Sequence, residues 1–353
     1  MRRITRHLLS LSPANAGEFL GKTKPARRAA MAATIAIALS GCMSAFDEVR
    51  APPPIPAKLI GAMAKNGSKP ESPVLVRIFK QESELEIWKQ NKSGQYALLK
   101  TYPMCRWSGK LGPKTKAGDR QAPEGFYHVS ARMLNPKSQF YLSFNLGYPN
   151  RLEQALGYTG EALMVHGACS SSGCYALTDQ GVGEIYPVVQ RALAGGQGQF
   201  QVQAYPFRMT ATNMARNSGD PNFNFWKNIK QGYDIFEATK RQPKVSVCGG
   251  RYVFNTDFAN GEPTDPLGAC PATTATSDAG LMARLQTEDA KVAGIVANQT
   301  PAPVNSYVDG GMHPSFRTLL EKNGAEKLAA KISGTKYPIS RPDAALADPY
   351  AGL

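Results

Sequence analysis

The sequence predicts a mainly β fold of the α+β class, with helices at its periphery. Short runs of apolar and β-branched residues recur through the middle of the chain and are separated by turn residues, as in a fold built from many short strands. The loops between these runs are rich in glycine and proline. At 353 residues the chain is long enough for one sizeable core with appended segments.

The predicted strands follow each other through residues 73–262, which we expect to form one domain. Apolar residues alternate in the first two runs, as they do in strands with one buried face. The hairpin prediction comes from two short β runs around Gly249-Gly250. The predicted strands are VLVRIF (74–79), ELEIWKQ (84–90), YALLKTYPM (96–104), LMVHG (163–167) and FQVQAYPF (200–207), with the hairpin at KVSVCGGRYVF (244–254).

Helices are expected at three places. Thr178 or Asp179 can cap a helix over 183–194 that stops at Gly195-Gly196. Asp220-Pro221 opens a second helical stretch. Beyond the domain, residues 263–353 are expected to form a helical and partly disordered peripheral region, with helical patterns near 278–297 and 313–331.

Residues 1–42 carry a predicted export signal. Basic residues at 24–28 precede the apolar run AAMAATIAIAL, which is too short to span a bilayer and is typical of a secretory signal peptide. The run ends in LSGC, which resembles a bacterial lipobox, so we expect lipidation of Cys42. Residues 43–72, rich in Pro, Ser and charge, are expected to be a flexible tether. The sequence therefore predicts a periplasmic protein with a lipid anchor in a membrane, expected to be the outer membrane.

The net charge of +14 lies partly in this signal. Residues 1–41 hold seven Lys or Arg and one acid and so contribute +6, which leaves +8 for the remainder. This excess suggests an anionic surface or polymer as a neighbour. Because no basic block is interleaved with aromatic residues, we do not expect nucleic acid as a partner.

Export would place the other cysteines in an oxidising compartment, where disulfides form. Without Cys42 five cysteines remain, and an odd number means that at least one stays free or pairs outside the chain. Cys248 and Cys270 are candidates for a disulfide that closes a loop of 21 intervening residues, worth roughly 3 kcal/mol. Cys105 and Cys169 are left over, and a bond between them is a further hypothesis.

The segment HGACSSSGCYALTD, residues 166–179, holds the strongest candidate for catalysis. A thiol becomes a nucleophile as the thiolate, which a nearby imidazole and a helix N-terminus favour. His166 precedes Cys174 by eight residues, and Cys174 is expected just before the capped helix. The backbone amides around Gly173 and Cys174 are expected to form an oxyanion hole.

Other interpretations of the same residues stay open. His166, Cys169 and Cys174 could ligate zinc, although the spacing lacks a C-x2-C pair and a fourth ligand. A disulfide between Cys169 and Cys174 would make the loop structural, and reversible oxidation of this pair would make it a redox site. His166 could also be an ordinary hydrogen-bonded histidine at a strand end.

Four motifs in order carry a resemblance to a known family. They are GPKTKAGDRQAPEGFY (112–127), LNPKSQFYLSFNLGYPN (134–150), MVHGACSSSGCYALTD (164–179) and YPFRMT (205–210). Over about residues 74–258 the chain resembles the YafK-type branch of the L,D-transpeptidase catalytic domain superfamily. The resemblance implies a YkuD-like mixed β-sandwich, an enzyme that acts on peptidoglycan stem peptides in the periplasm, no cofactor, and inhibition by carbapenems.

The resemblance also implies roles for individual residues. Cys174 matches the family's nucleophile and His166 its general base, and Gly173 with Ser172 falls in the Ser-x-Gly-Cys turn, with an oxyanion or orienting role. The thiol would attack the carbonyl at the L-centre of diaminopimelate, expel D-alanine or another amine and leave a thioester. An amine of a second stem peptide would then give a cross-link, whereas water would give hydrolysis.

The motif departs from the wider superfamily in ways that the YafK-type branch shares. The segment between His-Gly and the cysteine is short, Ser172 stands where the wider family has histidine, and the usual Arg after the cysteine is missing. This branch includes an enzyme that cleaves the amide between diaminopimelate and a lipoprotein. The alternative function is therefore an amidase whose partner is an outer-membrane lipoprotein or another wall-attached protein. An alternative of another class is a non-catalytic peptidoglycan-binding lipoprotein.

Three further side chains are candidates for substrate binding. Arg208 in YPFRMT and Arg120 in GDRQAPEG are expected to hold a substrate carboxylate by bidentate hydrogen bonds, with a structural or solvated Arg as the alternative. Tyr148 is expected to line the cleft, although the building of a turn in GYPN is its other interpretation. We expect no metal.

Overall fold

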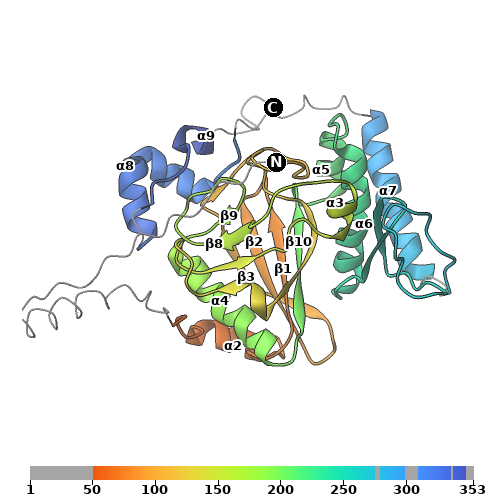
Figure 1. Cartoon of the computed structure of the whole chain (residues 1–353), viewed down its shortest axis with the longest axis horizontal. Helices are drawn as coiled ribbons and strands as arrows, with labels where there is room; N and C mark the ends of the chain where they lie inside the picture. The colour runs from red at the N-terminus through yellow and green to blue at the C-terminus, as the bar shows by residue number, and fades with distance from the viewer. Residues whose placement is uncertain (1–50, 275–278, 299–308, 335–336, 347–353) are drawn as a thin grey trace, which may run out of the picture. The chain divides into compact units, whose positions relative to one another are not determined.

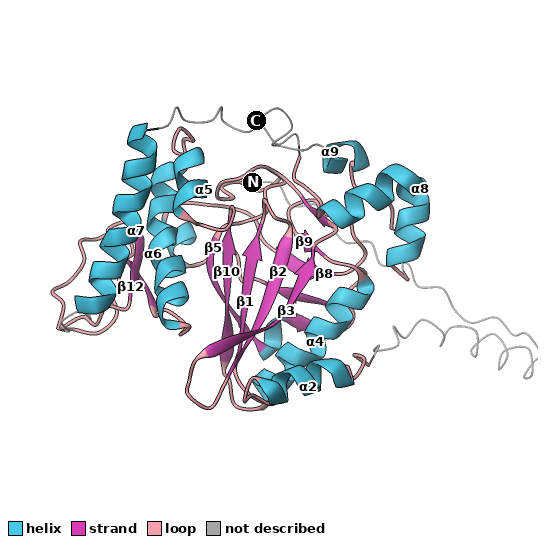
Figure 2. Ribbon diagram, turned by 180° about the vertical axis from the view of Figure 1, so that it is seen from behind, coloured by secondary structure: helices cyan, strands magenta, loops and turns pink. Residues whose placement is uncertain are grey.

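The computed structural model describes residues 51–274, 279–298, 309–334 and 337–346, all within the compact unit Val49–Leu353. Its β part consists of two five-stranded sheets and a hairpin (Figures 1 and 2). The first sheet has the strand order β3 (Tyr96–Pro103), β2 (Glu84–Gln90), β1 (Val74–Phe79), β10 (Gln199–Tyr205), β5 (Gly125–Ser130). The second has the order β4 (Arg106–Trp107), β9 (Tyr175–Ala176), β8 (Met164–His166), β7 (Ser143–Asn145), β6 (Leu134–Asn135), and the hairpin joins β11 (Val245–Cys248) to β12 (Arg251–Phe254).

The two sheets share one hydrophobic core. Phe144 of β7 packs edge-on against Phe200 of β10, with ring centroids 5.5 Å apart, and both rings are fully buried. Helix α4 (Asp179–Ala194) contacts β1 and β10 of the first sheet as well as β7 and β8 of the second. The chain thus forms a mixed β-sandwich with helices around it, and the predicted α+β class is confirmed.

The central strand β1 is more buried than its alternating sequence predicts. All six of its residues are buried, because helix α6 (Phe223–Thr239) covers the face opposite the core. Arg77 on that outer face is paired with Glu237 of α6 at 2.6 Å, and its guanidinium lies over the ring of Phe236. β1 pairs in parallel with β10 and antiparallel with β2.

The remaining helices surround the sheets. The 3₁₀ turn η1 covers Ala131–Met133, and the other helices are α3 (Arg151–Ala155), α5 (Ala211–Arg216), α7 (Ala279–Asn298), α8 (Pro314–Ile332) and α9 (Pro342–Leu346). In both views α5, α6 and α7 lie at one end of the sheets, whereas α8 and α9 lie toward β8 and β9 (Figures 1 and 2). Among the helices that the structure describes, none combines the length and the apolar character needed to cross a bilayer.

The prediction of a flexible tether is wrong for residues 51–72, the part of it that the structure describes. Residues 57–65 form helix α2 (Ala57–Lys65), and its Leu59 and Met63 are buried in the main core. These two side chains are four residues apart and therefore lie on one helix face, which buries itself beside β3. The signal peptide, the lipobox with Cys42 and the first residues of the tether fall outside the described residues.

The C-terminal region does not behave as a merely peripheral appendage. Its helices α7 and α8 begin close to where the periodicity predicts them. Residues 309–346, however, contact the segment around Cys174, as detailed below. The Pro- and Ser-rich composition of this region led to the peripheral prediction and gave no sign of these contacts.

Candidate active site

The pairing of β8 with β9 brings the two predicted catalytic side chains to one face. These strands run in parallel, with Val165 opposite Tyr175 and His166 opposite Ala176. Cys174 immediately precedes β9, and its Sγ accepts a hydrogen bond of 3.4 Å from the amide of Met164. Because side chains alternate along a strand, His166 and Cys174 project to the same face of neighbouring strands, offset by two residues.

His166 is held as a neutral base with a defined tautomer. Its Nδ1 lies 2.7 Å from the carbonyl oxygen of Gly167, which can only accept, so Nδ1 carries the hydrogen and Nε2 keeps its lone pair. Burial lowers the pKa of His166 to about 4, against smaller opposing effects of the Gly167 carbonyl and the Asp179 carboxylate. The imidazole is therefore uncharged at neutral pH, and Nε2 is the nitrogen that can take a proton.

The Cys174 thiol is neutral as well. Burial raises the pKa of Cys174 above that of a free cysteine, although the Met164 amide and the charge of Lys114 both act to lower it. Lys114 is buried and donates hydrogen bonds to the Asp119 carboxylate and the Lys116 carbonyl. The resting pair is therefore an uncharged thiol and an uncharged imidazole.

The turn before Cys174 is organised by Ser171. Its hydroxyl accepts hydrogen bonds from the amides of Cys174 and Gly173, at 3.1 and 3.3 Å, and donates to the Cys174 carbonyl at 2.7 Å. Gly173 has φ of +133°, which disfavours any side chain there. Both amides that we expected to form an oxyanion hole thus point at Ser171 in this arrangement, and the expected hole at Gly173 and Cys174 is not formed.

The other cysteine of the loop is tied to a different strand. Cys169 forms a disulfide with Cys105, which precedes β4, and Cys248 forms one with Cys270. Cys174 is the free cysteine of the described residues, so a Cys169–Cys174 bond is not present. Within the described ranges no three His, Cys, Asp or Glu side chains gather as a metal site.

The predicted helix N-terminus does not lie at the thiol. Cys174 leads into β9, and α4 begins only at Asp179 after the N-cap Thr178. The earlier helix start comes from the Thr178 side chain, which accepts a hydrogen bond from the amide of Gly181. Asp179 serves the loop directly, because its Oδ1 accepts a hydrogen bond of 2.8 Å from the amide of Ala168.

Of the proposed substrate-binding residues, Arg120 lies at the loop and Tyr148 beside Lys114. Arg120 places its guanidinium 3.5 Å from the hydroxyl of Ser172 and is paired with Asp309 at 3.0 Å. Ser172 is exposed, whereas Tyr148 is buried and donates from its hydroxyl to the carbonyl of Lys114 at 3.2 Å. Arg120 is therefore positioned at the loop, and Tyr148 holds the segment that carries Lys114.

Arg208 is engaged elsewhere. Its guanidinium forms ion pairs with Glu84 and Glu86 of β2 and lies over the ring of Phe79 of β1. These contacts raise the pKa of Arg208 further, against the effect of burial. They fit the structural interpretation of Arg208, and its role in substrate binding stays a prediction.

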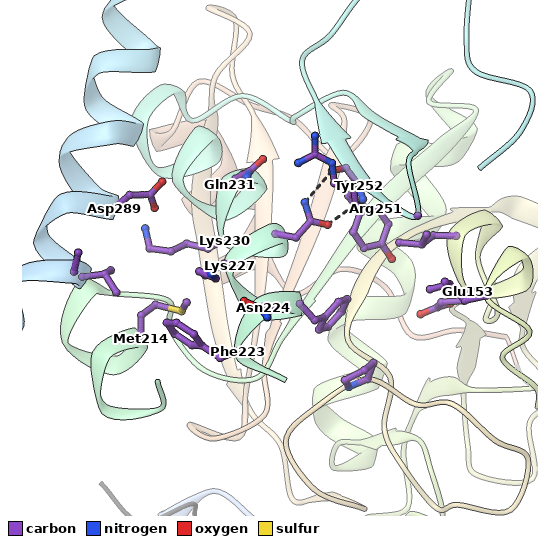
Figure 3. Close-up of a pocket in the computed structure, with 18 of the residues that line it drawn as sticks. Glu153, Met214, Phe223, Asn224, Lys227, Lys230, Gln231, Arg251, Tyr252 and Asp289 are labelled. Atoms are coloured by element: carbon purple, nitrogen blue, oxygen red, sulfur yellow. Dashed lines mark hydrogen bonds between the residues drawn. The ribbon is translucent and has the colours of Figure 1, made fainter. Parts of the chain in front are cut away.

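One cavity lies against helix α6 and does not reach the Cys174 thiol. It has a volume of about 810 Å³ and is lined by residues of α3, α5, α6, α7 and β12. Phe223, Lys227 and Lys230 of α6 face Asp289 of α7 and Tyr252 of β12 across it (Figure 3). Neither Cys174 nor His166 lines this cavity, although its wall includes Pro113, the neighbour of Lys114.

Comparisons with known proteins match the domain that carries this site. The family model of the L,D-transpeptidase catalytic domain, YkuD, matches residues 73–203. The chain is 48% identical over 189 residues to YafK of Escherichia coli (strain K12), which is named as an L,D-transpeptidase. This match covers 54% of this chain and 76% of YafK, and YafK of Escherichia coli O157:H7 matches equally.

The chain belongs to the YafK-type L,D-transpeptidase family. It is an L,D-transpeptidase-type enzyme of the cell wall, and such a catalytic domain implies peptidoglycan stem peptides as substrate. Among solved structures, the helical cell shape determining protein Pgp2 from Campylobacter jejuni is similar, with 16% identity, a TM-score of 0.32, and coverage of 68% of this chain and 78% of that one. Bd1075 of Bdellovibrio bacteriovorus gives 14% identity and a TM-score of 0.29, covering 49% and 76%.

The state of the Cys174 thiol can be measured by alkylation. We expect the rate of iodoacetamide labelling of the Cys174 peptide to rise with a midpoint above that of free cysteine, about 8.5. Lys114→Met removes the cation that favours the thiolate and should raise this midpoint by roughly half a unit or more. Labelling followed by mass spectrometry across pH gives both values.

Lys116→Met is the matched control for this measurement, because the Lys116 side chain is exposed and lies two residues away. It should leave the midpoint unchanged. A wild-type midpoint below about 7 would show a resting thiolate, and would contradict the neutral pair.

Proposed function

We propose that Cys174 is the nucleophile and His166 the general base of an enzyme that acts at diaminopimelate in peptidoglycan stem peptides. One observation carries the proposal. The free cysteine of the described residues projects from the start of β9 to the face on which β8 presents a neutral imidazole. The YafK-type family provides the substrate class.

The first half-reaction forms a thioester. Sγ of Cys174 attacks the carbonyl carbon at the L-centre of diaminopimelate while its proton passes to Nε2 of His166. The imidazolium that forms is stabilised by the Gly167 carbonyl at Nδ1 and by the charge of Asp179. Nε2 then returns the proton to the departing nitrogen, so the C–N bond breaks and D-alanine or another amine leaves as the neutral amine.

The second half-reaction uses the same two groups in reverse. An acceptor amine or a water molecule gives its proton to Nε2 and attacks the thioester carbonyl. The C–S bond breaks, and sulfur regains the proton from the imidazolium. An amine acceptor yields a cross-link, and water yields a shortened or released stem peptide, so the identity of the acceptor decides between the two reactions.

The pair also supports this role through its charge. A neutral thiol and a neutral imidazole face the substrate, so no charge has to lose its hydration when a peptide covers the site. Lys114 lies close enough to favour negative charge on sulfur as the thiol transfers its proton. The buried position of Lys114 keeps this effect from being screened by solvent.

Substitution of the two residues tests the proposal. Cys174→Ala should lower turnover of tetrapeptide muropeptides by at least about 1000-fold, because no other described thiol is free. His166→Gln should lower it by about 100-fold or more. Product masses from muropeptides and from lipoprotein-linked sacculi give the rates and separate cross-linked dimers from cleaved monomers.

Thr318→Ala on the exposed face of α8 is a control that removes a hydroxyl away from the loop. Activity that survives Cys174→Ala would refute the nucleophile. Wild-type protein that binds sacculi but turns over neither substrate would instead favour the non-catalytic wall-binding protein.

We further propose that the enzyme is exported to the periplasm and anchored to the outer membrane through lipid on Cys42. The lipobox-like LSGC directly after the apolar run supports this proposal. The chain has 14 residues between Cys42 and the start of α2 at Ala57. Ile55 of this segment packs against the main core, so the residues before it would link the lipid to the folded domain.

The anchor has its own test. Wild-type protein should fractionate with the outer membrane, and its N-terminal peptide should carry the mass of a lipidated cysteine. Cys42→Ser should release the protein into the soluble periplasmic fraction with its activity on muropeptides retained. A wild-type protein that is soluble, or that is membrane-bound without lipid on Cys42, would refute the anchor.

A further inference from the structure

Residues 309–334 and 337–346, here called the C-terminal strap, contact the catalytic loop at several points. The strap begins at Asp309 and includes α8 and α9, which lie beside β8 and β9 (Figures 1 and 2). It lies beyond residues 73–203, which the family model matches. The catalytic loop is residues 166–174, from the proposed base to the proposed nucleophile.

The strap is fixed first to β4. Gly311 and Trp107 exchange two backbone hydrogen bonds, of 3.0 and 3.1 Å. Gly310, with φ of +79°, comes so close to the Trp107 carbonyl that a side chain could not fit there. Asp309 accepts a hydrogen bond of 2.9 Å from the amide of Gly109 and pairs with Arg120. The start of the strap thus extends the sheet that carries the site.

Ser340 of the strap holds the turn before the nucleophile. Its hydroxyl accepts a hydrogen bond of 3.0 Å from the amide of Ser171 and donates one of 2.5 Å to the carbonyl of Ser171. The Ser340 carbonyl in turn accepts a hydrogen bond of 2.9 Å from Nε of the buried Arg106. Ser171 is the residue whose hydroxyl binds the amides of Gly173 and Cys174. The strap therefore contacts the backbone of Cys174 through a single intervening residue, Ser171.

The strap also reaches the proposed base. The ring of Tyr337 packs on the ring of Phe140 at 4.7 Å, and the other neighbour of Phe140 is the imidazole of His166 at 4.8 Å. Asp179, which binds the amide of Ala168 in the loop, accepts hydrogen bonds from the amide of Gly334 and the hydroxyl of Ser333. Both ends of the catalytic loop therefore have partners in the strap.

The middle of the loop packs on the strap as well. Cys105 and Cys169, joined in a disulfide, form a buried cluster with Met312, Phe316 and Ile339. Ala168 and Cys169 have φ of +63° and +52°, a conformation that costs energy for residues other than glycine. Such a loop persists only when its surroundings hold it in place, and the strap supplies part of these surroundings through its packing on Cys169.

We propose that the C-terminal strap positions the catalytic loop for reaction, with Ser340 as the positioning residue for Cys174 and Tyr337 as that for His166. The proposal rests on the proposed roles of Cys174 and His166. Ser340 acts through Ser171 and does not touch the substrate. Loss of its hydroxyl frees the Ser171 backbone, loosens the turn and exposes the thiol, so turnover falls while the thiol becomes more open to small reagents.

Ser340→Ala tests the strap in the full-length protein. We expect kcat on muropeptides to fall about tenfold or more with KM changed by less than about threefold, because the reacting groups are misplaced while the substrate contacts remain. Alkylation of Cys174 by iodoacetamide should become faster, opposite in direction to turnover. Ser340→Thr keeps the hydroxyl and should restore both values to near wild type.

Thr318→Ala removes a hydroxyl from the same strap away from the loop and should change neither value. Tyr337→Leu keeps an apolar side chain against Phe140 but removes the aromatic ring that packs there. This substitution should lower kcat without speeding alkylation, because it acts on His166 and not on Cys174. Ser340→Ala with kcat and alkylation both equal to those of Thr318→Ala would overturn the proposal. A fall in kcat that is as large in Ser340→Thr as in Ser340→Ala would also overturn the proposal.

An experiment that refutes the strap proposal can be distinguished from one that refutes the catalytic roles of Cys174 and His166. If Cys174→Ala is inactive while Ser340→Ala behaves as wild type, only the strap proposal fails. If Cys174→Ala is active, the catalytic roles fail first. Amide hydrogen exchange at Ser171 and Cys174, which needs no activity, should still be faster in Ser340→Ala, and unchanged exchange would overturn the strap on its own.

Discussion

The site depends on the parallel pairing of two very short strands, β8 and β9. Their register sets Met164 beside Cys174 and places His166 on the face that Cys174 shares. A slip of one residue in this register would turn one of the two side chains to the opposite face. Because β8 has only three residues and β9 two, the strands cannot fix their own register, and the surrounding contacts must do so.

Those contacts come from four directions. The Ser171 hydroxyl binds the turn before Cys174, and the Cys105–Cys169 disulfide connects the loop to the segment that leads into β4. Asp179 at the start of α4 binds the amide of Ala168, and Ser340 of the strap binds the backbone of Ser171. Within this enclosure His166 is buried and Cys174 is half-buried, and the loss of contact with solvent favours the neutral form of both side chains. The same enclosure thus explains the geometry of the site and its protonation state.

The sequence predicted the local elements better than the contacts between them. Apolar runs mark β1 and β2 to the residue, and the motif with His166 and Cys174 points to the candidate site. The tether prediction failed because the Pro, Ser and charge content of the segment outweighed its short apolar stretch LIGAM (59–63). The burial of Leu59 and Met63 depends on the sheet that they meet. The oxyanion prediction failed because one serine hydroxyl takes both amides, which no spacing reveals. Nothing in the polar C-terminal sequence pointed to the strap.

The central claim is that a neutral Cys174 thiol attacks with the help of a neutral His166. Acylation by a carbapenem, followed as the mass of the Cys174 peptide across pH, tests it most directly. The account predicts one adduct per chain, on Cys174, with a rate that falls only as acid protonates His166 near its pKa of about 4. An adduct on another residue, no adduct, or a rate that falls through the ordinary histidine value of 6.5 would contradict it.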